Sequence, residues 1–505
     1  MMHWRAEPSP TPARPRRTKP AAPPASPAAV ARPASIGQSF MIRCLAMAVA
    51  ALLTANGVIV AEQVTGRDLI TLSTDGMSNA REAIARLLGE HKDKSPVVAG
   101  VVVEKSSTTT TTAAPGGQDS TTTAPAAVPP APAAPAAPGA TTTTAGPAKT
   151  TTTTAKKAPA GSPATDWNHV AETVRPYIEK ETSLPFTGPL KVTALDTDPF
   201  NARLDAVRMA PALDRARRAE ATLKALGIIE PTVNLADQVK RLSTGAVTAF
   251  YDVKANELVI RNGQLTPFML KSIVHEMVRA DYDQHFELDR PALVNPDDET
   301  GVAWDSLVEG SASRIEARFI TALPDNDKKS VQAEQQRIAG QLPKDLPDYV
   351  LVEYAFPFGS GPKFADYLMS NGGPARVNAA FQHPPTTTEQ IIHPEKFVAG
   401  EGPKAMTNPT ADAPAIRSGS LGQLMISLML AQVLDPNQAE TVADGWGADR
   451  YVVWQNGGQT CVRLSVDMDS PDKVTAMGQA LGDWAKNTPG ATVTGSGPFT
   501  VTRCQ

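Results

Sequence analysis

Residues 272–286 read "SIVHEMVRADYDQHF" and form the second half of one long stretch with helical spacing. Ile273 and Met277 lie four residues apart, so that their apolar side chains share one face of a helix. At the start of the stretch, Thr266 is a suitable N-cap and Pro267 suits the first helical turn. We therefore predict a single helix from residue 267 to the end of the quoted stretch.

A β-hairpin precedes this helix and a second helix follows it. Residues 246–263 read "AVTAFYDVKANELVIRNG", in which apolar side chains alternate up to Tyr251 before a polar turn and the returning "ELVIR". The second helix is expected at about 303–320 and contains the sequence "LVEG". These elements predict an α+β fold, with a mostly helical domain over 166–400.

The N-terminal third of the chain has a composition that does not suit a folded core. Of the 505 residues, 45 are proline and only 5% are aromatic, and the prolines concentrate in a basic arm, 1–38, and a Thr/Pro/Ala-rich linker, 106–165. Such segments carry too few large apolar side chains to fold, so we expect disorder. The linker is interpreted as a stalk, with a solvated linker of no specific length as the alternative.

An apolar run lies between these two segments. Residues 39–61 are long and apolar enough for a transmembrane anchor or for a signal peptide, and a short membrane-proximal segment, 62–105, follows. The start codon is either Met1 or Met41. Residues 1–43 hold seven Arg or Lys and one acid, which favours a cytoplasmic N-terminus. We expect a single-pass cell-membrane protein whose C-terminal part is extracytoplasmic, or alternatively a secreted one.

The C-terminal 90 residues predict a second, smaller domain. Residues 416–505 read as helix, helix, strand, strand, helix, strand, strand, which indicates a small α+β domain with an antiparallel sheet. Cys461 and Cys504 are an even pair in an exported region, so we expect a disulfide, with two free buried thiols as the alternative. The net charge of −4 gives no indication of a nucleic-acid partner.

The pair His275 and Glu276 carries the chemistry of the quoted stretch. When a second histidine follows four residues after the first, both imidazoles point to one side of the helix and can share a zinc ion. The glutamate then acts as general base on the metal-bound water, and a third ligand comes from further along the chain. In this chain, however, the second histidine position is occupied by Arg279.

The region resembles zinc metallopeptidases of the HExxH type with a downstream glutamate ligand (gluzincins). It resembles more closely a group of predicted exported proteins whose helix reads H-E-L-x-H-A-L-Q-D-Q-H-F. The residues that match this pattern are His275, Glu276, Ala280, Asp283, Gln284, His285 and Phe286. The segments "LVEG", "PPTTTEQIIHPEKF" and "GWGADRYVVW" resemble later motifs, so the resemblance spans about 170–505. It implies a metallopeptidase-like fold in which Glu276 is the base and His275 and Glu309 are metal ligands.

Arg279 departs from this pattern in a way that changes the expected chemistry. A guanidinium has no free lone pair and stays protonated, so it cannot bind zinc. It can instead neutralise buried carboxylates through charge-assisted hydrogen bonds. We therefore expect an ion pair from Arg279 to Glu309 and Glu276 in place of the metal. His285 lies about 15 Å along the helix and is not expected to supply a ligand. The loop residues His383 and His393 could fold back toward the site, but we expect a structural role for them.

These observations lead to three hypotheses about function. The first is a pseudoenzyme without a cofactor, a catalytically inactive metallopeptidase-like protein that binds or scaffolds in the cell envelope. Its partner would be an extended peptide, bound along the strand ending at Tyr251, or an envelope polymer. The second is an active zinc-dependent peptidase with a non-standard ligand set. The third is a purely structural protein with a stalk and a head.

Overall fold

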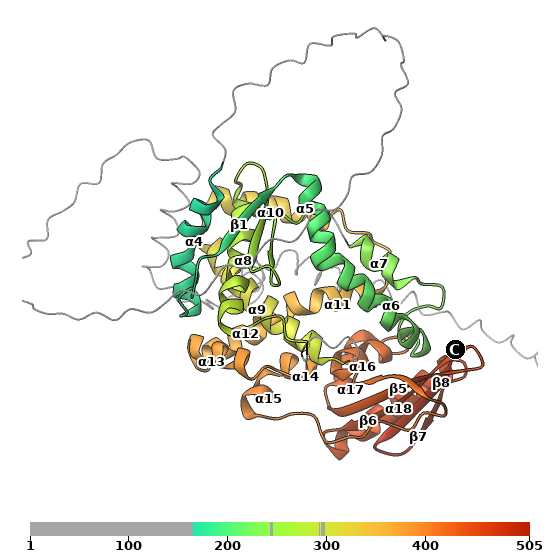
Figure 1. Ribbon diagram of the computed structural model, residues 1–505. Coiled ribbons are helices and arrows are strands. Elements are labelled where there is room, and N and C mark those ends of the chain that lie inside the picture. Colours follow the sequence, from blue (N-terminus) through green and yellow to red (C-terminus); the bar gives the residue numbers. More distant parts are fainter. Residues whose placement is uncertain (1–164, 243–245, 292, 294–297) are drawn as a thin grey trace, which may run out of the picture. The chain divides into compact units, whose positions relative to one another are not determined.

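The computed structural model describes residues 165–242, 246–291, 293 and 298–505, which fall in one compact unit. The fold is α+β and mostly helical, with two small sheets (Figure 1). The expected arm, the apolar run and nearly all of the linker lie outside the described residues. Within the described part of the chain, no helix has the length and apolarity needed to cross a membrane.

The first sheet has three strands in the order β1-β3-β2. Strand β1 (Lys191–Leu195) runs parallel to β3 (Glu257–Arg261), and β2 (Ala249–Asp252) pairs with β3 as an antiparallel hairpin. The predicted hairpin is thus confirmed. Its turn contains Asn256 in the left-handed region (φ 49°), a conformation that asparagine tolerates well. Strand β2 lies at the edge of the sheet, where helix α8 packs against it.

The helices surround a core centred on α8 and α9. In chain order they are α4 (Trp167–Thr182), α5 (Thr197–Leu204), the π-helix η1 (Asp205–Met209), α6 (Ala210–Ala225), α7 (Leu235–Arg241), α8 (Pro267–Phe286), α9 (Thr300–Ala322), α10 (Asp325–Ala339), α11 (Asp348–Gly359), α12 (Gly361–Ser370), α13 (Gly373–Gln382), α14 (Thr388–Ile392) and α15 (Pro394–Ala399). The bounds of α8 confirm the prediction, and Thr266 caps it by accepting a hydrogen bond from the amide of Met269.

Helices α8 and α9 lie against each other, and α9 also packs closely on α12. The closest approach is at Gly310 of "LVEG", where an added Cβ would lie 2.2 Å from the carbonyl carbon of Gly361. Only glycine leaves room for two backbones at this separation. The glycine therefore fixes how α9 packs on α12, and with it the position of the neighbouring Glu309.

One helical region contains a π-turn. Helices α5 and α6 and the π-helix η1 between them form one continuous helical segment that begins at Thr197. Pro211 lies in the first turn of α6, directly after the π-helical turn. Proline cannot donate a backbone hydrogen bond, and the wider π-turn accommodates it by changing the bonding pattern.

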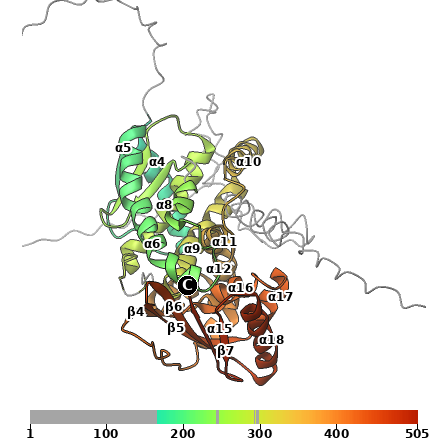
Figure 2. The same cartoon turned by 90° about the vertical axis from the view of Figure 1, so that its right-hand side faces the viewer.

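The C-terminal part begins after a segment without helix or strand, residues 401–414, and contains a five-stranded antiparallel sheet (Figure 2). Its elements are β4 (Ala415–Gly419), α16 (Gly422–Leu430), α17 (Pro436–Ala443), β5 (Trp446–Asn456), β6 (Gln459–Met468), α18 (Pro471–Asn487), β7 (Thr492–Thr494) and β8 (Phe499–Cys504). The strand order is β4-β5-β6-β8-β7. Cys461 and Cys504 face each other on β6 and β8 and form the expected disulfide.

Candidate functional site

Helices α8 and α9 bring the sequence-predicted site residues together. His275, Glu276 and Arg279 lie on α8, and Glu309 lies on the facing side of α9. His275 and Glu276 are buried, at 8% and 5% exposure. Charged side chains at this depth need partners, because leaving one unpaired in the interior costs several kcal/mol.

Both ring nitrogens of His275 contact carboxylates. Nε2 lies 3.0 Å from Oε2 of Glu309, and Nδ1 lies 2.8 Å from Oε2 of Glu316, two turns further along α9. Burial alone lowers the pKa of His275, but the two carboxylates outweigh this effect and raise it to about 9. His275 is therefore an imidazolium at neutral pH, with both N–H groups donating.

Glu316 also accepts a hydrogen bond from the ammonium group of Lys271, at 2.8 Å. Burial favours its neutral form, but Lys271 and His275 more than compensate and lower the pKa of Glu316 to about 2. Sequence reasoning missed both residues. The sequence did contain a signal for Glu316, because it follows Glu309 by seven residues and so lies on the same side of the helix.

Arg279 lies between the carboxylates of Glu309 and Glu276. Its Nη1 atom is 3.2 Å from Oε1 of Glu309 and 3.5 Å from Oε2 of Glu276, and 14% of its side chain is exposed. Burial opposes ionisation of Glu309, but Arg279 and then His275 hold the pKa of that carboxyl well below its usual range. Arg279 thus shares its positive charge between Glu309 and Glu276, at the position that the H-E-x-x-H pattern gives to a second histidine.

Glu276 is occupied by further contacts that the sequence did not predict. Nη2 of Arg208 lies 2.9 Å from each of its oxygens, and the backbone amide of Tyr251 donates to Oε2 at 2.9 Å. Arg208 belongs to the π-helix η1, which reaches the site from outside the α8–α9 pair. No local sequence signal identifies such a contact, because it depends on the tertiary position of the π-turn.

The contact to Tyr251 also affects the edge of the first sheet. Tyr251 lies on the edge strand β2, and its outward amide is already bonded to Glu276. A peptide that added to this edge would need backbone donors and acceptors that remain free. The site therefore offers less of the strand edge for peptide addition than its sequence suggested.

Zinc, which the resemblance implies, does not fit this set of donors. A catalytic zinc ion takes three protein ligands, whereas here His275 and Glu309 bond directly to each other and a guanidinium lies beside Glu309. Within the part of the chain that the structure describes, no group of three or more His, Cys, Asp or Glu is arranged to hold a metal.

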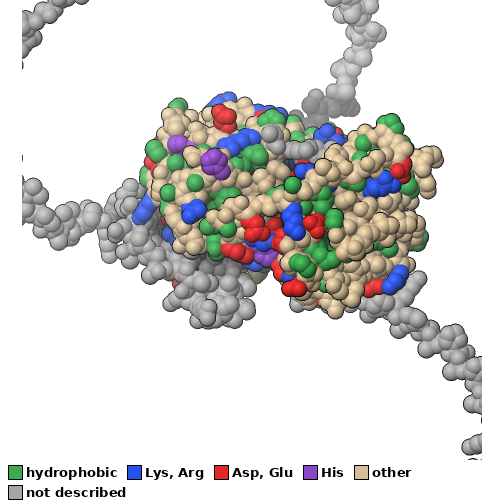
Figure 3. All heavy atoms as spheres, turned by 90° about the horizontal axis from the view of Figure 1, so that it is seen from below, with side chains coloured by type: hydrophobic (Ala, Val, Ile, Leu, Met, Phe, Trp, Pro, Cys, Tyr) green, Lys and Arg blue, Asp and Glu red, His purple; other side chains and the backbone are tan. Residues whose placement is uncertain are grey.

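The remaining histidines singled out by the sequence lie elsewhere. His285, in the last turn of α8, lies 2.8 Å from the carbonyl oxygen of Pro185, which fixes the end of the helix. His393, between α14 and α15, lies 2.9 Å from Asp444 in the C-terminal part. Figure 3 shows that acidic, basic and histidine side chains lie next to one another on one face of the described residues. Neither histidine reaches the α8–α9 cluster.

Comparison with known proteins finds a match for the C-terminal part of the chain. A family model described as "Domain of unknown function (DUF8575)" matches residues 412–503, which cover the C-terminal sheet and its helices. No curated protein and no solved structure matches the chain.

Proposed function

We propose that this protein is a pseudoenzyme of the cell envelope, with a degenerate metallopeptidase-like domain that binds or scaffolds and does not cleave peptides. One observation carries the proposal: Arg279 lies 3.2 Å from Glu309, in the position that the resembling enzymes use for a metal ligand. The four cations Lys271, His275, Arg279 and Arg208 pair with three carboxylates, those of Glu276, Glu309 and Glu316.

The state of Glu276 supports the same proposal. A general base needs a free carboxylate oxygen within hydrogen-bond reach of the water that it activates. Both oxygens of Glu276 bond to Arg208, and one also accepts from the amide of Tyr251. Such a carboxylate holds η1, β2 and α8 together. It is a structural anchor in a cluster that no longer performs acid–base chemistry.

The cellular context of the proposal comes from the N-terminal sequence. We propose that residues 39–61 anchor the chain in the membrane and that the linker, 106–165, carries the folded part away from the surface. The partner is an extended peptide or an envelope polymer. The disulfide between Cys461 and Cys504 suits an extracytoplasmic location, because disulfides persist in oxidising compartments.

A second candidate is an active zinc peptidase with a non-standard ligand set. It is favoured by the contact from Nδ1 of His275 to Glu316, since zinc-binding histidines are commonly oriented by a carboxylate on the nitrogen that faces away from the metal. For this function Arg279 would have to leave Glu309, and another donor would have to take its place.

A cleavage assay separates the two candidates. The full chain, purified in detergent, is incubated with zinc and a library of unstructured peptides, and products are followed by mass spectrometry. The pseudoenzyme produces no cleavage above that of a Glu276→Gln variant. Cleavage by the wild type that the Glu276→Gln variant lacks would refute the pseudoenzyme and support the second candidate.

A further inference from the structure

Two buried carboxylates lie where the start of α9 meets the C-terminal part of the chain. Glu299 directly precedes α9 and is 5% exposed, and Asp449 on β5 is 2% exposed. The hydroxyl of Ser420 lies 3.2 Å from Oε1 of Glu299 and 3.2 Å from Oδ1 of Asp449. Ser420 therefore bridges the two acids, which come from opposite sides of this junction.

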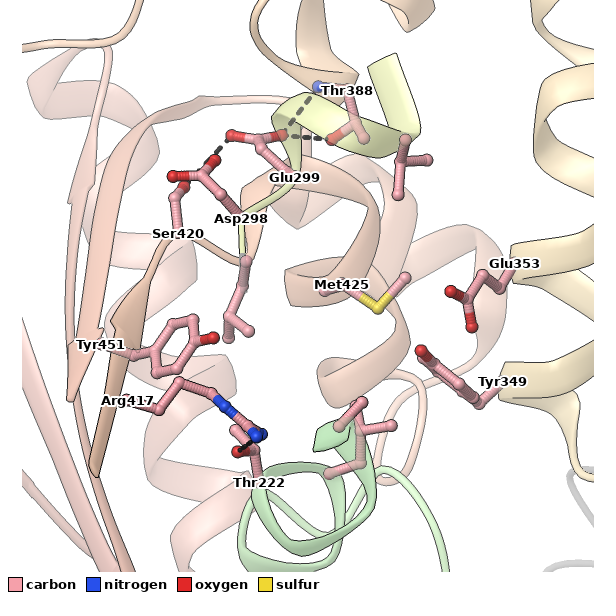
Figure 4. Close-up of a pocket in the computed structure, with 14 residues that line it drawn as sticks. Thr222, Asp298, Glu299, Tyr349, Glu353, Thr388, Arg417, Ser420, Met425 and Tyr451 are labelled. Atoms are coloured by element: carbon pink, nitrogen blue, oxygen red, sulfur yellow. Dashed lines mark hydrogen bonds between the residues drawn. The ribbon is translucent and has the colours of Figure 1, made fainter. Parts of the chain in front are cut away.

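The junction borders a small cavity of about 90 Å³ (Figure 4). Figure 4 shows Glu299, Thr388 and Ser420 at one end, whereas Glu353 and Tyr349 project from α11 on the other side of Met425. The carboxyl of Glu299 already has protein partners, as does that of Glu353, which bonds to Tyr349. Both carboxyl groups are therefore engaged in hydrogen bonds to other residues of the protein.

A count of hydrogens shows that the bridge needs an additional proton. The amide and the hydroxyl of Thr388 both donate to Oε2 of Glu299 at 2.7 Å, so that only Oε1 faces Ser420. Asp449 accepts from the amides of Leu421 and Gly422 and from the indole of Trp446. The Ser420 hydroxyl has one hydrogen, which can reach only one of the two acids.

Asp449 is the acid that is suited to remain ionised, because three other N–H groups already donate to it. If Ser420 donates to Asp449, Oε1 of Glu299 faces a hydroxyl oxygen and must itself carry a proton to make a hydrogen bond. If Glu299 is ionised instead, its Oε1 atom and the hydroxyl oxygen of Ser420 face each other without a hydrogen between them. The hydrogen bond between these two residues is then lost, and the new negative charge repels that of Asp449.

We propose that Glu299, Ser420 and Asp449 form a pH-sensitive joint between α9 and the C-terminal part, which is closed while Glu299 holds a proton and loosens when that proton is lost. The joint is connected to the α8–α9 cluster through α9, because this helix also carries Glu309 and Glu316.

The electrostatic surroundings of Glu299 place the transition near pH 8. Burial, followed by the charge of Asp449, raises the pKa of Glu299 to about 8, and Thr388 opposes this shift. Asp298 adds further repulsion, although Arg450 lies 3.5 Å from that carboxylate. Because the folded-state pKa is raised, the joint loses stability as pH rises from the unfolded value, about 4.5, through 8.

On the side that faces α16, the joint is tightly packed while it is closed. Gly422 has a positive φ of 73°, and a Cβ added there would lie 1.7 Å from Oε2 of Glu299. Glu299 thus packs directly on the backbone at the start of α16. An ionised Glu299 cannot gain a new partner there without displacing the C-terminal part from α9.

The indole of Trp446 provides a local measurement in the full-length wild type. Its Nε1–H donates to Asp449 at 3.0 Å, so its NMR resonance reports on the joint. The resonance is expected to shift with a midpoint near pH 8. A resonance that stays unchanged between pH 6 and 9.5 would overturn the proposal, and this test requires no variant.

Variants then identify the group that titrates. Glu299→Gln carries a permanent neutral donor, so we expect it to abolish the transition of the Trp446 resonance and to raise the melting temperature at pH 9 relative to the wild type. Asp298→Asn removes a charge one residue away and should retain the transition. Retention of the transition in Glu299→Gln, or its loss in Asp298→Asn alone, would contradict the assignment to Glu299.

Discussion

At the scale of single residues, Arg279 decides what the α8–α9 cluster can do. A histidine there would add a lone pair aimed at the same point as His275, whereas the guanidinium adds a fixed positive charge against Glu309. The sequence alone predicted the ion pair between Arg279 and Glu309. It could not identify Arg208 or Lys271 as further cations, because those contacts depend on how separate elements pack.

Removal of the guanidinium should destabilise the fold. Arg279→Ala removes a cation that contacts both Glu309 and Glu276. We expect the free energy of unfolding to fall by about 3 kcal/mol, as it does when one partner of a buried ion pair is removed. Urea denaturation measures this loss. Arg218→Ala is the control, since Arg218 pairs with Asp214 on the surface of α6, where the two side chains are 50% and 55% exposed, and its loss should cost less than about 1 kcal/mol. Equal losses in the two variants would contradict a special role for Arg279.

The imidazolium of His275 makes a separate prediction about pH. Its pKa of about 9 in the folded state exceeds the unfolded value of about 6.5, so its contribution to stability is complete below pH 6.5 and is lost as pH rises through 9. NMR of the ¹⁵N-labelled imidazole should show both nitrogens protonated at pH 7.5. A neutral ring with one protonated nitrogen at that pH would refute the charged arrangement.

At the scale of elements, local signals predicted some parts well and missed others. Helix α8 was predicted because its cap, its proline and its apolar spacing all agree. The hairpin β2–β3 was predicted from alternation and turn chemistry. Strand β4 was missed, because it is a short edge strand defined by its pairing with β5. The π-turn that precedes Pro211 has no local sequence pattern either.

The packing of α9 on α12 provides a test at this scale. Gly310→Ala places a Cβ 2.2 Å from the backbone of Gly361, so we expect it to destabilise the fold by roughly 3 kcal/mol through overpacking. Gly482→Ala is the matched control, because Gly482 lies inside α18 with nothing within 4 Å of the added Cβ. That variant should be neutral or gain up to about 1 kcal/mol of helix propensity. Thermal unfolding of both variants decides whether the close approach exists.

At the scale of the whole molecule, the α+β class and the disulfide were predictable because composition, strand alternation and cysteine pairing are readable without tertiary information. The junction at Glu299 was not, since its partners come from α14, β5 and the residues between β4 and α16. The match to a domain family over 412–503 covers the C-terminal part of that junction, and not Glu299 or α9.

The disulfide should contribute to the stability of the C-terminal part. It closes a loop with a sequence separation of 43, which corresponds to about 4 kcal/mol in the chain-entropy model. A Cys461→Ala/Cys504→Ala variant is therefore expected to unfold at a lower urea concentration than the wild type. An unchanged midpoint would show that β6 and β8 do not depend on the cross-link.

Zinc retention tests the central claim, that an arginine has replaced the metal, most directly. The full-length wild type, Arg279→His and the control Arg318→His are loaded with zinc, dialysed and analysed for bound metal. We predict that the wild type and Arg318→His retain no stoichiometric zinc and that Arg279→His binds one ion. Stoichiometric zinc in the wild type, lost on His275→Ala, would contradict the claim.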